Sequence, residues 1–350
     1  MQIMYVITRY LKADLYGGVE QKISLIAEAL SKRSIDVLII TGLSAGRFQD
    51  KLKDLDIKFV VVESRLEMML VLLRLVRKIR VLQSHEAVDS ILVRFIKLIR
   101  PSIIHLYRVH TYMDGYFTGF RKLVVSYFDM ISSFLVDRYV ILSKALENEI
   151  LCNDRKKYLL RNGIDIPRSR PCHVAKTQLK TIAIIGDIQE RKQIVMTVQA
   201  LLNCSNFEKI YIAGNPKENS EFERLNRLIS SNSDIIEYLG FLDRVGVELL
   251  LKRVDCVCLL SKAEGLPTVL LESFYYGAIP VFNNVGGVGE VLFDKVNGFV
   301  MSFDNLDELV RISRDEELIK RISRNSYDSF TKEYTKEFMA NYFIRIYELF

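Results

Sequence analysis

The fold is indicated most clearly by residues 256–277, which read CVCLLSKAEGLPTVLLESFYYG. The first five residues form an apolar run typical of a buried strand, and Thr268–Tyr276 has the length and pattern of a helix. Pro267 stands where a helix would begin, since no N–H is needed there, and Gly277 stands where that helix is expected to end. The stretch therefore predicts a strand, a loop that carries Glu264, and a helix with Glu272 about one turn inside it.

Similar strand-like runs recur along the chain, separated by segments of helical length. In the first half they are Ile3–Thr8, Val37–Ile40, Lys58–Val62, Ile103–Tyr107 and Tyr139–Leu142. In the second half they are Thr181–Ile185, Lys209–Ala213, Ile235–Tyr238, Cys256–Leu260, Ile279–Phe282 and Gly298–Met301. Helices fit between them at Val19–Leu30, Phe222–Ser230, Arg244–Lys252 and Thr268–Tyr276. Apolar strands that alternate with helices predict the α/β class, with parallel sheets covered on both faces.

A chain of 350 residues is expected to form two domains, because most domains have about 50–250 residues. The segment Asn162–Pro167 and the polar stretch that follows it to Lys180 contain turn residues without periodicity, which is typical of a linker. We place the boundary near residue 165, with domains over 1–165 and 166–335. Parallel sheets bind ligands at the carboxyl ends of their strands, so we expect a small-molecule site in a cleft between the domains.

Composition and charge restrict the classes of partner. Apolar residues make up 49% of the chain, which is ample for packed cores. Residues 1–165 contain 26 Lys and Arg against 18 Asp and Glu, a net charge of +8, whereas the remainder has 23 against 25, a net charge of −2. The basic half is suited to phosphates, nucleic acid or an anionic membrane, and charge alone does not choose among them.

The chain ends and the cysteines indicate a cytoplasmic protein. The N-terminus lacks the pattern of a secretory signal, and no uncharged apolar run is long enough to span a bilayer. The five cysteines include no CxxC pair, and strand alternation places Cys256 and Cys258 on one face. We expect core thiols there rather than a zinc or disulfide site.

Glu264 and Glu272 are the candidate functional residues of the quoted stretch. Free N–H groups at the helix start offer a site for an anion such as a phosphate. A carboxylate beside them accepts hydrogen bonds from paired hydroxyls, as on a sugar or a ribose. The alternative is a glutamate that only favours the helix dipole, which explains Glu272 in part and Glu264 poorly.

An ordered set of motifs resembles the family 4 retaining glycosyltransferases. The E-x7-E pattern of Glu264 and Glu272, with residues 277–281 (GAIPV) and 286–290 (GGVGE), is similar to the donor-site signature of that family. Further similar motifs are Gly17-Gly18-Val19-Glu20, Asn162-Gly163-Ile164-Asp165, Ala213-Gly214-Asn215, Leu239-Gly240-Phe241 and Asn297-Gly298-Phe299. The resemblance covers nearly the whole chain. It implies the GT-B fold, two Rossmann-like domains facing across a cleft, with a C-terminal helix over 336–350 that returns to the N-terminal domain.

The resemblance also implies roles for individual residues. Glu272 would hold the ribose hydroxyls of the donor nucleotide, and Glu264 would contact hydroxyls of the transferred sugar rather than act as a nucleophile. Lys192 would bind the diphosphate and stabilise the negative charge that develops on the leaving nucleotide. The other expected donor-binding residues are Gly17, Gly18, Gly214, Gly240, Gly265 and Leu266, and the main chain at Gly286-Gly287 would also approach the donor.

Two positions need separate comment. The family usually has a basic residue directly after the glycine at position 186, where this chain has Asp187, and an aspartate there would repel a diphosphate. Arg191 is the expected substitute; the alternatives are an unusual donor pose or lost activity. His110 follows a strand at its carboxyl end, where the family often has a histidine near the donor, so it is a candidate catalytic residue with Glu264 and Lys192. His85 and His105 are expected to be structural.

A basic segment in the first domain suggests a membrane. Leu66–Leu82 places Arg74, Arg77 and Lys78 at helical spacing on one face, opposite apolar residues. Such a helix favours contact with an anionic membrane surface; the alternative is an ordinary helix packed on its sheet. Nucleic acid is disfavoured, because no aromatic-basic motif appears and the overall net charge is only +6.

Together these patterns predict a cytoplasmic enzyme, peripheral to the inner face of the membrane. It would move a hexose-type sugar from a nucleotide sugar, most simply UDP-linked, to a hydroxyl of a glycan or lipid-linked acceptor in surface polysaccharide or glycolipid synthesis. We expect no cofactor and no metal, because no Asp-x-Asp motif stands at a strand end. The alternatives are a sugar-nucleotide epimerase on the same fold and a non-catalytic subunit. A dehydrogenase is disfavoured, since Gly17-Gly18 lacks the G-x-G-x-x-G spacing.

Overall fold

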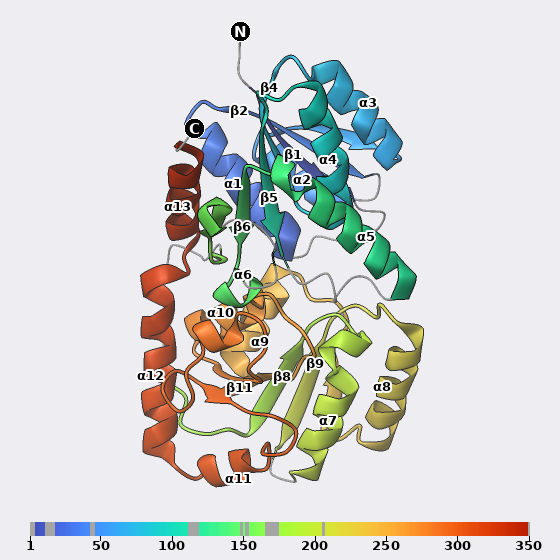
Figure 1. Cartoon of the computed structure of the whole chain (residues 1–350). Helices are drawn as coiled ribbons and strands as arrows, with labels where there is room; N and C mark the ends of the chain where they lie inside the picture. The colour runs from blue at the N-terminus through green and yellow to red at the C-terminus, as the bar shows by residue number, and fades with distance from the viewer. Residues whose placement is uncertain are drawn as a thin grey trace. The chain divides into compact units, whose positions relative to one another are not determined.

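The computed structural model describes residues 4–10, 18–42, 46–110, 119–147, 150, 154–164, 175–204 and 207–348. The chain divides into two compact units, one formed by residues 1–165 with 336–350 and the other by residues 166–335 (Figure 1). Each unit is built on a parallel sheet with helices on both faces, which confirms the α/β class. No helix in the described part of the chain is long and apolar enough to cross a membrane.

The first unit is built on a sheet whose order is β3-β2-β1-β4-β5-β6-β7 over its described residues. The strands are β1 (Met4–Arg9), β2 (Asp36–Gly42), β3 (Lys58–Val62), β4 (Ile79–Ser84), β5 (Ile104–Val109), β6 (Arg138–Ile141) and β7 (Lys157–Leu159). The order reverses between β1 and β4, which are neighbours in the sheet. This reversal is the topological switch point, where sheets of this kind bind ligands.

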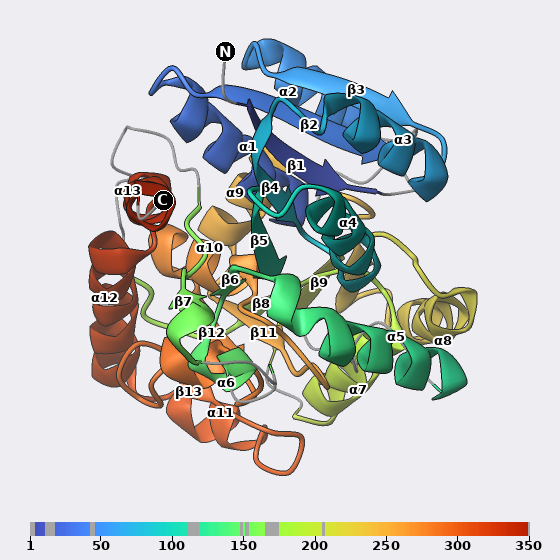
Figure 2. The same cartoon turned by 45° about the horizontal axis from the view of Figure 1, so that its top comes forward.

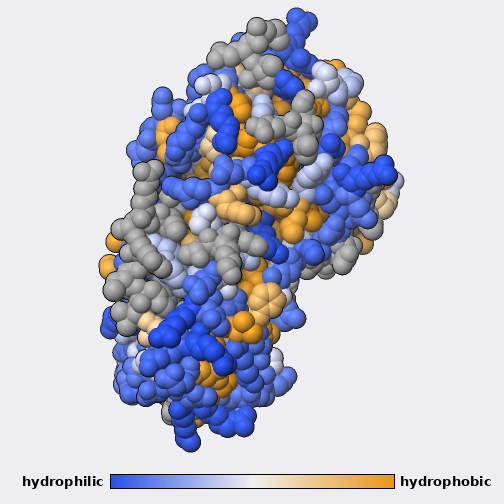
Figure 3. All heavy atoms as spheres, turned by 90° about the vertical axis from the view of Figure 1, so that its left-hand side faces the viewer, coloured by the Kyte–Doolittle hydropathy of each residue, from blue (hydrophilic) through white to orange (hydrophobic). Residues whose placement is uncertain are grey.

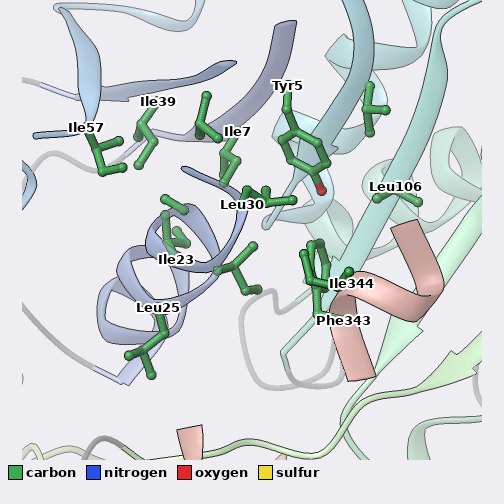
Figure 4. Close-up of a cluster of buried hydrophobic side chains, with 14 of the residues drawn as sticks. Tyr5, Ile7, Ile23, Leu25, Leu30, Ile39, Ile57, Leu106, Phe343 and Ile344 are labelled. Carbon is green, nitrogen blue, oxygen red and sulfur yellow. The ribbon is translucent and has the colours of Figure 1, made fainter. Parts of the chain in front are cut away.

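Helices cover both faces of this sheet, as Figures 1 and 2 show. One face carries α1 (Gly18–Ser31), α2 (Gly46–Asp54) and α13 (Lys336–Glu348), and the other carries α3 (Arg65–Leu75), α4 (Ala87–Ile99) and α5 (Gly119–Ser132). The core under α1 and α13 includes Tyr5, Ile23 and Phe343 (Figure 4), with the Tyr5 and Phe343 rings 6.3 Å apart. The return of the last helix to the N-terminal domain is therefore confirmed.

The expectation of a continuous basic helix over Leu66–Leu82 is wrong. The helix α3 ends at Leu75, residues Val76–Lys78 form a turn, and Ile79 begins strand β4. Arg77 and Lys78 thus lie outside the helix and share no helical face with Arg74. The helix pattern and the apolar run of the next strand are continuous in sequence, and β4 pairs with both β1 and β5 in the sheet interior.

The second unit contains a sheet of order β10-β9-β8-β11-β12-β13 over its described residues. The strands are β8 (Thr181–Ile185), β9 (Lys209–Ala213), β10 (Ile236–Tyr238), β11 (Cys256–Leu259), β12 (Ile279–Phe282) and β13 (Phe299–Val300). The helices are α7 (Ile194–Asn203), α8 (Asn219–Ser231), α9 (Arg244–Arg253), α10 (Thr268–Tyr276), α11 (Glu308–Ile312) and α12 (Glu316–Glu333). Its switch point lies between β8 and β11.

The interior of the second unit is apolar, and Cys256 and Cys258 lie buried on β11 as free thiols, as expected. Burial raises the pKa of both thiols, so they are protonated core side chains. Most of the surface seen from the side of α12 and α13 is hydrophilic, with scattered hydrophobic areas (Figure 3).

Candidate active site

The carboxyl ends of β8 and β11 bring the expected donor-binding residues together at the switch point of the second unit. After β8 the chain passes through Gly186 and Asp187 to the short 3-10 helix η4 (Glu190–Lys192). After β11 it forms the loop that carries Glu264 and then enters α10. Arg191 and Glu264 are far apart in sequence, but the topology places their loops side by side.

Glu264 is the centre of this site. Its side chain is only 7% exposed, and Lys192 Nζ lies 2.5 Å from Glu264 Oε1. The Ser261 hydroxyl donates to the same oxygen at 2.7 Å, and Arg191 Nη1 lies 3.6 Å from Oε2. A buried carboxylate is stable only when it is paired and hydrogen-bonded, and these three groups provide that. The sequence predicted Glu264, Lys192 and Arg191, but not the hydroxyl of Ser261.

These contacts fix the ionisation of Glu264. Burial alone raises the pKa of a carboxyl group, but the Lys192 and Arg191 charges and the hydrogen bonds from Lys192 and Ser261 outweigh it and lower the pKa of Glu264. The group is therefore an anion at neutral pH. An ionised carboxylate accepts hydrogen bonds but donates none, so it suits the hydroxyls of a sugar.

The loop that carries the two cations is held by the main chain. The Lys262 N–H donates to the Arg191 carbonyl at 2.8 Å, and Arg191 Nη1 donates to the Ala263 carbonyl at 2.6 Å. Gln193, directly after Lys192, has φ +50°, a left-handed conformation that non-glycine residues seldom adopt. Strain of this kind concentrates at functional sites, which agrees with the placement of Lys192 against Glu264.

The helix α10 begins and ends where the sequence predicts. It follows Pro267, which has no side-chain oxygen to cap the first turn, and it stops at Gly277, whose φ is +77°. Its amino end, the positive end of the helix dipole, points to the carboxyl edge of the sheet. Glu272 lies half-buried in the second turn of the helix.

Two glycines allow the loops of the site to pack closely. A Cβ atom on Gly286, which has φ +54°, would stand 1.7 Å from the Glu264 carbonyl oxygen, and the Gly287 N–H donates to the Gly265 carbonyl at 2.6 Å. A Cβ atom on Gly214 would stand 1.9 Å from the Gly186 carbonyl oxygen. Only glycine permits such approach of two backbones.

The remaining donor-binding predictions lie around these residues or in the first unit. Gly240 has φ +68° and its carbonyl accepts from the Gly214 N–H at 2.8 Å, while Leu266 is buried. Gly18 begins α1, and Gly17 lies outside the described residues. Asp187 is half-buried directly after Gly186, and its position near a bound phosphate stays a prediction.

His110 lies at the switch-point edge of the first unit, directly after β5. Its Nε2 is 2.7 Å from His85 Nδ1, and the two rings stack with centroids 5.0 Å apart. Gln83 Nε2 lies 2.5 Å from His85 Nε2, and the Tyr5 hydroxyl donates to Gln83 Oε1. Because an amide nitrogen only donates, His85 carries its proton on Nδ1 and donates it to His110. His110 therefore keeps its own proton on Nδ1, as a donor.

Cations surround this pair of histidines. Burial, followed by the charges of Arg108, Arg9 and Lys22, lowers the pKa of His110 well below its ordinary value of 6.5. Burial, followed by His110 and Arg108, does the same for His85. Both rings are therefore neutral at pH 7, and sequence reasoning missed the cations because they come from separate strands and from α1.

Arg9 and Lys22 have further roles in the first unit. Arg9 Nε lies 3.0 Å from Glu20 Oε1, so the glutamate of the glycine-loop motif ties α1 to the end of β1. Lys22 Nζ donates to the Gly163 carbonyl, and Arg108 Nη2 donates to Asn162 Oδ1 at 3.3 Å. The interdomain motif Asn162-Gly163 is thus anchored on this unit. His105 is buried, as expected of a structural residue.

Three histidines of the first unit make stability depend on pH. His85, His105 and His110 all have a pKa lowered well below 6.5, so between pH 7 and 5.5 the unfolded chain binds protons that the folded chain does not. Stability is full above about pH 7 and falls as the pH drops, by about 3–4 kcal/mol in total at pH 5.5 if all three stay neutral when folded. Urea unfolding at the two pH values measures the change. His105→Asn should remove about a third of it, and an unfolding free energy that does not change with pH contradicts the assignment.

Comparison with known proteins finds a family match over most of the second unit and relatives with similar sequences. Residues 165–329 match the model of the family described as Glycosyl transferases group 1. An uncharacterized glycosyltransferase of Haemophilus influenzae is 26% identical over 314 residues, which cover 84% of this chain and 85% of that protein. A Campylobacter jejuni protein is 27% identical over 154 residues, 41% of this chain and 42% of its own length. It is named GalNAc-alpha-(1->4)-GalNAc-alpha-(1->3)-diNAcBac-PP-undecaprenol alpha-1,4-N-acetyl-D-galactosaminyltransferase.

Solved structures confirm the fold. HepE of Anabaena, in complex with UDP and glucose, superposes with a TM-score of 0.83 at 15% identity, over 99% of this chain and 100% of that one. The lipopolysaccharide outer core galactosyltransferase WaaB superposes with a TM-score of 0.73 at 14% identity, over 99% of each chain. At such identities the likeness shows the fold, two Rossmann-like domains of the GT-B type.

Proposed function

We propose that this glycosyltransferase, whose residues 165–329 match the Glycosyl transferases group 1 model, moves a hexose-type sugar from a UDP-sugar to a hydroxyl of a glycan or lipid-linked acceptor, with retention of configuration. The observation that carries the proposal is the buried Glu264 carboxylate, paired with Lys192 at 2.5 Å at the switch point of the second unit. The UDP in the HepE complexes supports the choice of base, and the undecaprenol in the name of the Campylobacter jejuni relative supports a lipid-linked acceptor.

The site suits the charge changes of such a transfer. When the bond between the sugar C1 and the diphosphate breaks, the electron pair stays on the leaving phosphate oxygen, and the acceptor oxygen bonds to C1 while its proton passes to that phosphate. Lys192, Arg191 and Glu264 together carry a net charge of +1, so the cluster keeps a cationic excess for the leaving group. Glu264, held as an anion, orients the sugar through its hydroxyls.

The other residues complete the donor site in this proposal. Glu272, in the second turn of α10, accepts hydrogen bonds from the ribose hydroxyls, and the amino end of α10 favours the phosphates. Arg191 supplies the second cation for the diphosphate, because position 187, where the resembled family usually has a basic residue, is an aspartate. His110 donates from Nδ1 to the sugar or the phosphate. The proposal includes transfer without a resident metal and a cytoplasmic location in surface polysaccharide or glycolipid synthesis.

The direct test is turnover with a panel of nucleotide sugars and with glycan and lipid-linked acceptors. We expect nucleotide release that depends on the acceptor, a product whose anomeric configuration by NMR equals that of the donor, and unchanged turnover in EDTA. Nucleotide release without acceptor, together with an epimerised sugar, would overturn transfer in favour of the epimerase. An inverted product would overturn retention alone.

Glu272→Ala tests the ribose contact. Loss of hydrogen bonds to a charged acceptor costs about 1.5–3 kcal/mol, so the Kd for UDP should rise about 10–100-fold. Isothermal titration calorimetry measures it. Glu237→Ala, an exposed glutamate on the edge strand β10 of the same sheet, is the matched control and should leave the Kd unchanged. Equal affinity of the Glu272 variant and the unaltered chain contradicts the assignment.

A further inference from the structure

The helix α5 exposes most of its apolar side chains. Its described side chains are all at least partly exposed, with Phe120 at 80% and Leu123 at 68%. An ordinary surface helix turns its apolar stripe to the core and its polar residues to water. The apolar residues that α5 leaves most open are Phe120, Leu123, Tyr127, Phe128, Met130 and Ile131.

The polar side of α5 faces the protein instead. Arg94 of α4, only 1% exposed, lies 2.6 Å from the Asp129 carboxylate and donates to the Ser132 hydroxyl at 2.7 Å. It also donates to the Asp129 carbonyl at 2.8 Å. The helix is thus attached by its polar residues, and its apolar side points outward.

Neighbouring helices extend this outward surface. The helices α3, α4 and α5 pack in sequence on one face of the sheet and run side by side in Figures 1 and 2. Exposed apolar side chains continue on α4 at Phe95, Leu98 and Ile99, and on α3 at Leu66 and Leu70. We call the exposed apolar side chains of these three helices the apolar face. Large apolar side chains exposed together on neighbouring helices mark a surface that binds another protein or a membrane.

Positive charge surrounds the apolar face. The described basic side chains exposed on α3, α5 and the turn after α3 are Arg74, Arg77, Lys78 and Arg121, whereas the acidic side chains of the three helices, Glu67, Asp89 and Asp129, are partly or fully buried. Arg100, next to Ile99, donates to the Val76 carbonyl, which brings the exposed turn with Arg77 and Lys78 to the end of α4. Lys156 donates to the carbonyl of Phe134, just after α5, at 3.1 Å. Two copies of such a surface repel each other, whereas anionic lipid attracts it.

We propose that the apolar face binds an anionic phospholipid bilayer, with α5 lying along the interface and the basic residues against the headgroups. This deepens the proposed function, because a lipid-linked acceptor lies in such a bilayer. The sequence suggested that the basic segment 66–82 contacts the membrane. In this proposal the main contact is made by α5, whose aromatic and aliphatic side chains enter the membrane.

Vesicle sedimentation of the full chain tests the proposal. With vesicles of equal parts phosphatidylglycerol and phosphatidylcholine we expect strong binding, and weaker binding with phosphatidylcholine alone. The triple variant Phe120→Ser, Leu123→Ser, Phe128→Ser removes three large apolar groups and should lower the partition coefficient at least about tenfold. Its matched control replaces three apolar residues of the second unit that are more than half exposed, Val245→Ser, Leu249→Ser and Phe293→Ser, and should bind as the unaltered chain does.

Charge reversal separates the lipid classes. Arg77→Glu with Lys78→Glu should weaken binding to the anionic vesicles at least about tenfold and leave binding to phosphatidylcholine unchanged. No binding of the unaltered chain to anionic vesicles overturns the proposal, as does an equal loss in the control triple variant. The unaltered chain could instead bind no vesicles and form a dimer in light scattering, while the α5 triple variant is a monomer. That result assigns the apolar face to a second copy of this chain.

The proposed function is tested separately. Transfer to a soluble acceptor needs no membrane, so the α5 triple variant should retain it within about twofold while vesicle binding falls. If the unaltered chain binds vesicles but transfers no sugar, the proposed function is wrong, whereas the proposal that the apolar face binds a membrane is supported. Equal unfolding curves for the variants exclude a loss of fold as the cause.

Discussion

Lys192→Met should lower kcat for sugar transfer about 10²–10³-fold, the loss expected when a preorganised group that meets developing negative charge is removed. Lys192 Nζ lies against Glu264 beside the carboxyl end of β8, the position from which a cation meets the leaving diphosphate. Methionine keeps the length of the side chain without its charge. Steady-state release of nucleotide under saturating donor and acceptor measures the effect.

The matched control is Lys262→Met in the neighbouring loop. Lys262 is half exposed and pairs with Glu190 rather than Glu264, so kcat should stay within about twofold. Lys192→Met also leaves the Glu264 anion with weaker compensation, which costs about 3–5 kcal/mol of stability. Adding Glu264→Gln should restore stability but not turnover, which separates folding from catalysis. Lys192→Met with near-normal kcat contradicts its role at the leaving group.

The sequence predicted strands whose apolar runs stand alone between turns. Lys58–Val62, Thr181–Ile185, Lys209–Ala213 and Ile279–Phe282 have the predicted bounds. The strand β4 was missed because its apolar residues follow α3 after a turn of only three residues, and a short apolar run fits a helix as well as a strand. The strand β7 has only three residues, too few for a periodicity.

The contacts within the candidate site could not be predicted from the sequence. Glu264 and Glu272 were candidates from their position after a strand and at a helix start, but Lys192 was assigned only through a resemblance, because no spacing along the chain relates residue 192 to residue 264. The contact of Ser261 with Glu264 depends on how the loop folds after β11, which local propensity does not determine. The direction of α5 depends on Arg94, a buried arginine of another helix that draws Asp129 inward. Amphipathic pattern alone predicts the opposite, with the apolar side in the core.

Gly286→Ala should lower kcat/KM at least about 10²-fold and also destabilise the second unit. At φ +54° a Cβ atom costs about 1–2 kcal/mol, and here that atom would also stand 1.7 Å from the Glu264 carbonyl oxygen. One of the two backbones has to move, which shifts Glu264 away from Lys192. A displacement of about 1 Å at a reacting group is enough for a loss of this size. Donor kinetics and urea unfolding measure the two effects.

Substitutions at two other glycines separate the effects of backbone strain and lost stability from the displacement of Glu264. Gly119→Ala meets the same left-handed strain, with φ +58° and no atom within 4 Å, so it should cost about 1–2 kcal/mol and leave turnover unchanged. Gly298→Ala crowds Leu292 and Pro280, away from Glu264, so it should lower stability while the folded fraction keeps its kcat/KM. If Gly286→Ala behaves like either of these, the close packing at residue 286 is structural only. A loss of kcat/KM confined to Gly286→Ala shows that this contact positions Glu264.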